Sequence, residues 1–229
     1  MKKISVLTGA GISAESGIKT FRDADGLWEG YDVMEVASPQ GWQKNPAMVL
    51  EFYNQRRRQL KAVKPNAAHF ALAELEVKYE VDIITQNIDD LHERGGSSRI
   101  IHLHGELFKA RGIHYPSTIY DCRDDIKLGD TCQNGSQLRP HIVWFGEEVP
   151  KLQEAVPIVS AADIVIIIGT SMQVYPAAGL VGLARRDATI YYVDPKPAIN
   201  YELSILDNLE VISEKASTGV RKLVDRLME

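Results

Sequence analysis

Five short runs of this chain are almost entirely apolar, and they constrain the possible fold more than any other feature. Buried strands of a parallel sheet appear as continuous apolar runs, because both of their faces are covered. Helical patterns lie between these runs, and such alternation predicts an α/β protein with a Rossmann-like, doubly wound parallel sheet. The runs cover residues 4–8, 81–85, 100–103, 163–168 and 189–193, and the helical patterns cover 46–60, 66–79, 176–186 and 216–227.

Two stretches interrupt the alternation. One contains Trp28, Tyr31 and Trp42 among polar residues, and the other is rich in Asp, Gly and Ser. Both follow strands, so we expect them to project from the carboxyl edge of the sheet, where open α/β sheets bind ligands. We therefore predict one catalytic unit over residues 1–229, with a large domain and a smaller inserted one. The large domain takes approximately residues 1–24, 62–104 and 141–229, and the smaller one takes 25–61 and 105–140.

The composition excludes several classes of protein. A formal net charge of −5 gives no general electrostatic reason to bind nucleic acid or an anionic membrane. The longest apolar run, 164–168, is far shorter than the roughly 20 residues that span a bilayer. Cys122 and Cys132 are the two cysteines, too few for a disulfide framework in a chain of 229 residues. We expect a cytoplasmic protein.

A glycine-rich turn follows the first apolar run. Gly9, Gly11 and Gly17 stand where glycines let the backbone approach a pyrophosphate at a helix N-terminus. Five residues separate the second and third glycines, so the dehydrogenase pattern G-x-G-x-x-G is not met, and no Gly-Lys-Ser/Thr of a Walker loop follows. The stretch favours dinucleotide binding, with a tight turn as the alternative. Polar residues also follow two later runs, at 86–92 and 104–106, as a site at this sheet edge requires.

Five motifs together resemble those of the sirtuins, the NAD-dependent protein deacylases, and in particular the bacterial class III type that removes succinyl and malonyl groups. They are GAGISAESGI at 9–18, TFR at 20–22, TQNID at 85–89, LHG at 103–105 and GTS at 169–171. They occur in the family's order and span most of the chain. The resemblance implies that acylated lysines of proteins or peptides are substrates and that NAD is consumed.

The resemblance also implies which residues hold NAD. The turn would wrap the pyrophosphate, the segment after the second strand would take the nicotinamide ring, and later residues would approach the adenosine. The implied cofactor-binding residues are Gly9, Ala10, Gly11, Ile12, Ser13, Glu15, Ser16, Gly17, Ile18, Thr20, Phe21, Arg22, Trp28, Gln86, Asn87, Ile88, Asp89, Gly169, Thr170, Ser171, Asp194 and Ala216.

The implied reaction releases nicotinamide, then a base activates a ribose hydroxyl, and the products are free lysine and O-acyl-ADP-ribose. His104, with Asn87 and Asp89, would be catalytic. A histidine suits a base because its pKa of about 6.5 lets it accept a proton near neutral pH. His92 and His102 lie close in sequence, but only His104 belongs to the LHG motif, and we expect His102 on the opposite face of the sheet. A packed histidine is the alternative for His104.

The resemblance places the substrate peptide between two extended segments, where strand addition supplies affinity without demanding a sequence. Val143, Phe145, Gly146 and Val174 are the implied peptide-binding residues, and Trp144 is expected in the core.

Tyr53 and Arg56 point to the kind of acyl group. At i and i+3 of a predicted helix they share a face, and an arginine can hold a carboxylate with two hydrogen bonds. A Tyr-x-x-Arg pair reads the acyl carboxylate in sirtuins that remove succinyl and malonyl groups, and Ala37 stands where they keep a small residue. We expect desuccinylation and demalonylation, with deacetylation as well. A solvated basic helix face is the alternative, because Arg56 is followed by Arg57 and Arg58.

The chain departs from the family at the zinc site. Most sirtuins bind a structural zinc with two Cys-x-x-Cys pairs, whereas this chain has only Cys122 and Cys132, with Gly112 near the first expected cysteine. We predict no structural zinc and no other metal. The smaller domain must then rely on strand pairing or on apolar packing by Ile113, Tyr115, Ile119, Tyr120 and Leu128.

Two rival functions remain. An ADP-ribosyltransferase or NAD hydrolase would use the same pocket with another acceptor, and a non-catalytic NAD or ADP-ribose sensor would need no base. Tyr53 and Arg56 argue against the first, and His104 with Asn87 argues against the second. A monomer is expected.

Overall fold

Six parallel strands form the main sheet, in the order β11-β10-β9-β1-β4-β5. A computed structural model describes residues 1–19 and 27–229 of the chain. The strands are β1 (Lys3–Thr8), β4 (Glu80–Thr85), β5 (Ile100–His102), β9 (Ile164–Ile168), β10 (Thr189–Val193) and β11 (Leu209–Ile212). The five predicted runs coincide with five of these strands, which confirms the Rossmann-like α/β class. The edge strand β11 was not predicted.

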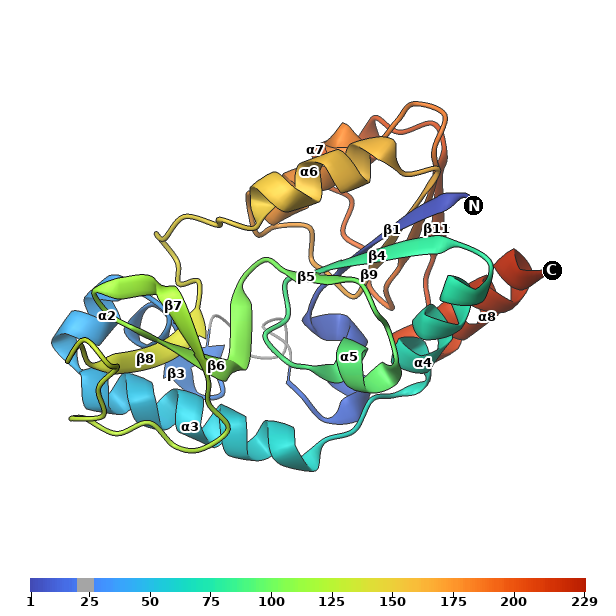
Figure 1. Ribbon diagram of the computed structural model, residues 1–229. Coiled ribbons are helices and arrows are strands. Elements are labelled where there is room, and N and C mark those ends of the chain that lie inside the picture. The colour runs from blue at the N-terminus through green and yellow to red at the C-terminus, as the bar shows by residue number, and fades with distance from the viewer. Residues whose placement is uncertain (20–26) are drawn as a thin grey trace.

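Helices cover both faces of this sheet (Figure 1). Val6, Ile83 and Ile166 face α4 and α8 in one core cluster, and Leu7, Ile84 and Ile167 belong to a second cluster that includes residues of α6. These helices and their neighbours are α4 (Ala67–Glu74), α5 (Leu91–Gly95), α6 (Leu152–Ala161), α7 (Tyr201–Ser204) and α8 (Ala216–Met228), with short 3-10 helices at Ala10–Ile12, Ala14–Ser16, Leu75–Val77 and Ala177–Leu183. The helical pattern at 176–186 therefore folds as a 3-10 helix.

A second body of structure lies beyond the carboxyl ends of the strands (Figure 1). An antiparallel sheet in the order β7-β6-β8 packs with three helices around a separate core cluster that contains Phe52, Leu107 and Trp144. Its elements are β2 (Leu27–Trp28), β3 (Tyr31–Asp32), α1 (Val33–Val36), α2 (Pro39–Lys44), α3 (Pro46–Ala62), β6 (Gly105–Gly112), β7 (Tyr115–Asp121) and β8 (Leu138–Ile142). We propose that this body is the smaller domain, and we call it the small lobe. Among the described helices, none is long and apolar enough to cross a membrane.

Strand pairing, one of the two sources of stability expected for the small lobe, is present. The expectation that the five named apolar residues pack together was wrong for three of them. Tyr115, Ile119 and Leu128 are 42%, 47% and 56% exposed. Ile113 is half-buried and packs against the lobe's core.

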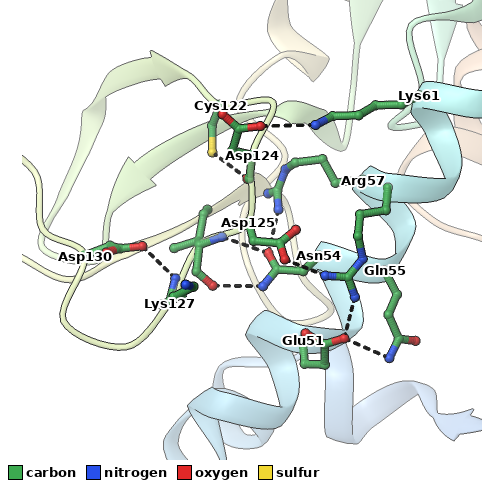
Figure 2. A network of polar contacts seen from close by, with 12 residues as sticks. Glu51, Asn54, Gln55, Arg57, Lys61, Cys122, Asp124, Asp125, Lys127 and Asp130 are labelled. Carbon is green, nitrogen blue, oxygen red and sulfur yellow. Dashed lines mark hydrogen bonds and ion pairs between the residues drawn. The ribbon is translucent and has the colours of Figure 1, made fainter.

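A polar network joins α3 to the loop at 122–130 (Figure 2). The side-chain amide of Asn54 pairs with the backbone of buried Ile126 at both ends, with Nδ2–O and Oδ1–N distances of 2.9 Å. Arg57, fully buried, donates from Nη1 to Asn54 Oδ1 at 2.8 Å and from Nε to the carbonyl of Leu107 on β6 at 3.1 Å. The network therefore connects helix, loop and sheet within the lobe.

We expect Asn54→Ala to destabilise the protein by about 3 kcal/mol, because it leaves buried polar groups of Ile126 and Arg57 without partners. Urea denaturation measures this change. Gln55→Ala is the matched control: it removes a hydrogen bond to exposed Glu51 on the same helix and should cost less than about 0.5 kcal/mol. Equal losses in the two variants would contradict a special role for the Asn54 network.

Candidate functional site

The glycine turn is held against the end of β9 by glycine on both sides. Gly9 donates its N–H to Ile168 O at 3.0 Å, and Gly11 donates to Gly169 O at 2.8 Å. A Cβ on Gly11 would lie 2.6 Å from Gly169 Cα, and one on Gly169 would lie 2.4 Å from the backbone nitrogen of Ile12. These glycines are thus required by the contact between two chain segments, a reason different from the approach of a pyrophosphate.

Ser13 lies at the centre of a buried polar array. Its hydroxyl donates to Asp89 Oδ2 at 2.9 Å and accepts from Asn87 Nδ2 at 3.2 Å. Asn87 is fixed further by its backbone N–H, which donates to Thr85 Oγ1 at 3.0 Å, and Asp89 Oδ1 accepts from the N–H of Leu91. The turn after β1 and the segment after β4 are therefore joined where the sequence predicts one site.

Burial raises the pKa of Asp89 to about 6, against the opposing hydrogen bonds from Leu91 and Ser13. A carboxyl group titrating near neutrality within an array of polar side chains is typical of functional sites.

His104 has the hydrogen bonding of a neutral base. Its Nδ1 lies 3.1 Å from the carbonyl oxygen of Gln86, and since a carbonyl can only accept, Nδ1 carries the proton and Nε2 keeps a lone pair. Burial lowers the pKa of His104, partly offset by this hydrogen bond. The imidazole is therefore neutral at pH 7 and able to accept a proton.

The other two histidines near this site differ from His104. His92 is fully buried, and its Nε2 lies 3.1 Å from Thr8 Oγ1. The centres of the His92 and His69 rings are 5.0 Å apart, so His92 is a packed core residue. The expectation that His102 faces away from His104 was wrong. Side chains two residues apart point to the same side of a strand, and His102 Nδ1 lies 3.1 Å from the carbonyl of Asn87, beside the Gln86 carbonyl that His104 holds.

Arg56 lines a cavity together with Trp28, Leu60, Ile88, Asp89 and Leu107. Its Nε and Nη1 atoms are buried without a hydrogen-bond partner among residues 1–19 and 27–229, and its guanidinium lies 4.8 Å from the centre of the Phe52 ring. Burial lowers the pKa of Arg56, while Glu29 and Tyr31 oppose the change; arginine nevertheless keeps its charge in proteins. Two unsatisfied donors on one cation beside a cavity are suited to an anionic ligand.

Tyr53, fully buried, lies three residues before Arg56 on α3 and packs against Trp28. Its hydroxyl accepts from Trp144 Nε1 at 3.1 Å, so its own proton remains available to donate. Burial raises the pKa of Tyr53, which keeps it protonated. Arg57 is buried in the lobe network and Arg58 pairs with Glu51 and Asp125, so the three consecutive arginines have three different surroundings. The solvated-face alternative describes Arg58.

The segments predicted to hold a peptide lie as follows. Val143 donates its N–H to the carbonyl of His104 at 2.9 Å, and Phe145 donates to Ala37 at 2.9 Å. The side chain of Phe145 is 42% exposed, whereas Trp144 is in the core, as expected. Gly146 has a left-handed backbone, and Val174 is half-buried. Ala37 is therefore tied to the same segment and is 4% exposed.

The remaining residues of the predicted NAD set have these positions. Ile12 belongs to the core, Ser16 Oγ accepts from Asn66, and Gly17 O accepts from Gln59. Ala10, Ile18, Ile88 and Ser171 are half-buried, and Ala216 is the buried first residue of α8. Thr170 Oγ1 accepts from Gln86, and Asp194 Oδ1 accepts from the N–H of Lys196. Thr20, Phe21 and Arg22 lie outside the described residues.

Sequence reasoning missed the contact made by Glu15. Its carboxylate accepts from the N–H of Ser217 at 2.9 Å and from the Ser217 hydroxyl at 2.8 Å. A carboxylate is favoured at this place because the N-terminus of α8 presents free N–H groups and a positive dipole end. The expected role of Glu15 toward NAD stays a prediction beside this structural one.

One group in the described part of the chain has ligand atoms close enough to hold a metal ion: Glu93, His102 and Glu106. Cys132 is buried and Cys122 is half-buried. A Cβ added at Gly112 would lie 2.9 Å from Cys132 Sγ. The absence of structural zinc stays a prediction.

Comparisons with known proteins agree with this arrangement. The Sir2 family model matches residues 9–176. An NAD-dependent protein deacylase of Helicobacter pylori is 61% identical over all of this chain and 99% of its own length, and one of Vibrio cholerae is 48% identical over 99% and 94%. A solved Sir2 homologue–NAD complex is 39% identical with a TM-score of 0.89, over 99% of this chain and 90% of its own. A Sir2 bound to acetylated peptide is 30% identical with a TM-score of 0.81, over 99% and 93%.

We expect Asp89→Asn to stabilise the folded protein at pH 8 by on the order of 2 kcal/mol, which corresponds to a rise of about two pKa units. A carboxyl group whose pKa is raised on folding lowers stability as the pH rises from about 4 through 6, because the folded state must give up a proton that it holds more tightly. The gain should therefore shrink as the pH is lowered toward 4.

Denaturation curves at pH 5, 6, 7 and 8 test this expectation. Asp225→Asn, which changes an exposed carboxylate of α8, should show only a few tenths of a kcal/mol at any pH. A constant difference between Asp89→Asn and the parent across this range would show that Asp89 is ionised throughout.

Proposed function

The chain belongs to the Sir2 family, and from this membership we propose that it removes acyl groups from lysine side chains of proteins in a reaction that consumes NAD. The comparisons place NAD-dependent protein deacylases among its relatives at up to 61% identity over the whole chain. The observation that supports the proposal most directly is the neutral His104 imidazole, with its free Nε2, beside the Ser13–Asn87–Asp89 array.

The residues of this chain are suited to NAD. The buried array offers amide, hydroxyl and carboxyl groups at one end of the cavity lined by Trp28, Ile88 and Asp89. Asn87, Asp89 and Ile88 would hold the nicotinamide end, and the turn at 9–18 would hold the pyrophosphate. NAD supplies the ADP-ribose group that accepts the acyl group. His104 Nε2 takes the proton of a ribose hydroxyl, and the Gln86 carbonyl keeps the ring in the required tautomer.

We propose further that the preferred acyl groups end in a carboxylate, such as succinyl and malonyl, with acetyl also accepted. Arg56 supports this choice because its Nε and Nη1 have no partner within the described residues and lie beside the cavity. Tyr53 keeps a free proton that can donate to the same carboxylate. Val143, Phe145, Gly146 and Val174 would hold the peptide, and Ala37 would leave room for the acyl chain.

An ADP-ribosyltransferase or NAD hydrolase would have no use for a cation that reads an acyl carboxylate. We propose a cytoplasmic monomer, for which the two free cysteines are consistent with a reducing compartment.

We expect Arg56→Met to reduce NAD-dependent desuccinylation by about 100-fold, because it removes one bidentate charge-assisted contact. Deacetylation should stay within about twofold of the parent rate, because an acetyl group has no carboxylate for Arg56 to bind. Mass spectrometry of succinyl-, malonyl- and acetyl-lysine peptides, with and without NAD, measures both rates. Arg58→Met is the matched control on the same helix, because Arg58 is bound to Glu51 and Asp125, and both activities should be unchanged.

His104→Ala should abolish every deacylation while the fold is kept. NAD cleavage by the parent protein with all acyl groups left intact would reject the deacylase proposal and favour the hydrolase or transferase. Equal loss of desuccinylation and deacetylation in Arg56→Met would reject only the carboxylate pocket.

A further inference from the structure

His102 has an acceptor at each of its two ring nitrogens. Nδ1 lies 3.1 Å from the carbonyl oxygen of Asn87, and Nε2 lies 2.7 Å from Glu93 Oε1 on α5. The carbonyl can only accept, so Nδ1 carries a proton. The short contact to Glu93 accounts for a second proton between Nε2 and the carboxylate, which makes an imidazolium–carboxylate pair. The side chain of His102 is 8% exposed, so this pair is shielded from solvent.

His102 and His104 hold two consecutive carbonyls of the segment after β4. His104 Nδ1 faces the carbonyl of Gln86, and His102 Nδ1 faces that of Asn87. Among the described residues, 1–19 and 27–229, Nε2 of His104 has no acidic partner like the one that Glu93 provides for His102. The hydrogen bond found for the His104 ring is the one at Nδ1. Two histidines on one side of the chain thus share a backbone role but differ in charge.

We propose that His102 is a positioning residue. As an imidazolium paired with Glu93, it fixes the Asn87 carbonyl and thereby holds residues 86–89 in the conformation that binds NAD. The inference rests on the proposed function and concerns a residue that does not touch the reacting atoms. With its carbonyl held by His102, its N–H by Thr85 and its amide by Ser13, Asn87 is fixed from three sides. Rotation of this one residue would displace both the amide and the neighbouring Asp89.

The charges around His102 favour its protonated form. Burial pulls the pKa of His102 down, but Glu93, Glu106 and the Asn87 carbonyl outweigh burial and leave it raised. Burial lowers the pKa of His104, so the two histidines titrate apart. The titratable groups that face His102 are Glu93 and His92 of α5, Glu106 with its partner Lys109 on β6, and Asp89.

The separation of the two histidines predicts a bell-shaped pH dependence of kcat/KM for NAD. Activity rises as His104 loses its proton and falls at higher pH as His102 loses one of its two, because the Glu93 carboxylate and the Asn87 carbonyl then compete for the proton that remains. In Glu93→Gln the alkaline fall should move to lower pH, because the carboxylate that favours the imidazolium is gone. In His102→Gln the alkaline fall should disappear and the plateau should drop about tenfold, the equivalent of one charge-assisted hydrogen bond.

The control is His114→Gln, which makes the same change at an exposed histidine of the small lobe and should leave the profile unaltered. All assays contain a chelator, since Glu93, His102 and Glu106 lie close enough to bind a divalent cation. If His102→Gln does not fold, as judged by its thermal transition, Glu93→Gln on the more exposed side of the pair carries the test.

Two measurements on the NAD-free and NAD-titrated protein separate this inference from the proposed function. NMR titration of the ring protons should give His102 a pKa above 6.5 in the parent and a lower one in Glu93→Gln. Calorimetry should show NAD binding weakened severalfold in His102→Gln. A parent protein without deacylase activity would reject the proposed function, while both measurements would still test whether His102 positions Asn87. An alkaline limb that stays in place in both variants, or a His102 ring that titrates below 6.5, would overturn the inference.

Discussion

The approach of Gly11 to Gly169 is the contact on which the site depends. The two backbones meet without side chains between them, and a single Cβ at either position would lie within 2.6 Å of the opposite backbone. This contact seats the turn after β1 on the end of β9, and so places Ser13 where it can bind Asp89 and Asn87 after β4. Segments after two neighbouring strands, β1 and β4, thereby form one polar array, and the end of β9 supports it.

The small lobe contributes a cation, Arg56, to the cavity at the edge of the main sheet. Helix α3 carries Arg56 toward the cavity, while Asn54 fastens the same helix to the loop at 122–130 (Figure 2) and Arg57 fastens it to β6. Two arginines next to each other in sequence therefore differ: Arg57 donates from Nε and Nη1 to groups of its own lobe, whereas Nε and Nη1 of Arg56 have no hydrogen-bond partner among the described residues.

Much of the fold followed from the sequence, because buried parallel strands leave an unmistakable apolar pattern. The strand Leu209–Ile212 did not, since it lies at the edge and is only half-covered, and neither did Tyr115–Asp121, most of whose side chains are exposed. Within the site, the prediction that the polar residues after two strands lie together agrees with the contact of His104 with the carbonyl of Gln86. The burial of Arg57 and the tie between Glu15 and Ser217 could not be predicted, because each depends on a partner distant in sequence. His102 was placed on the wrong face by a miscounted strand period rather than by a missing signal.

The tie between Glu15 and Ser217 has a consequence for how the protein is made. These residues are 202 positions apart. Strand β1 likewise cannot pair with β9, its neighbour on one side, until residues 164–168 have been synthesised. On the ribosome, the glycine turn can meet Asn66, Asn87 and Asp89 well before β9 and α8 become available to complete its contacts. Only when α8 leaves the exit tunnel can Glu15 find its partner. The glycine turn, among the first segments to be translated, therefore gains its last contacts only near the end of synthesis, and a nascent chain stalled before residue 217 would lack the Glu15 anchor.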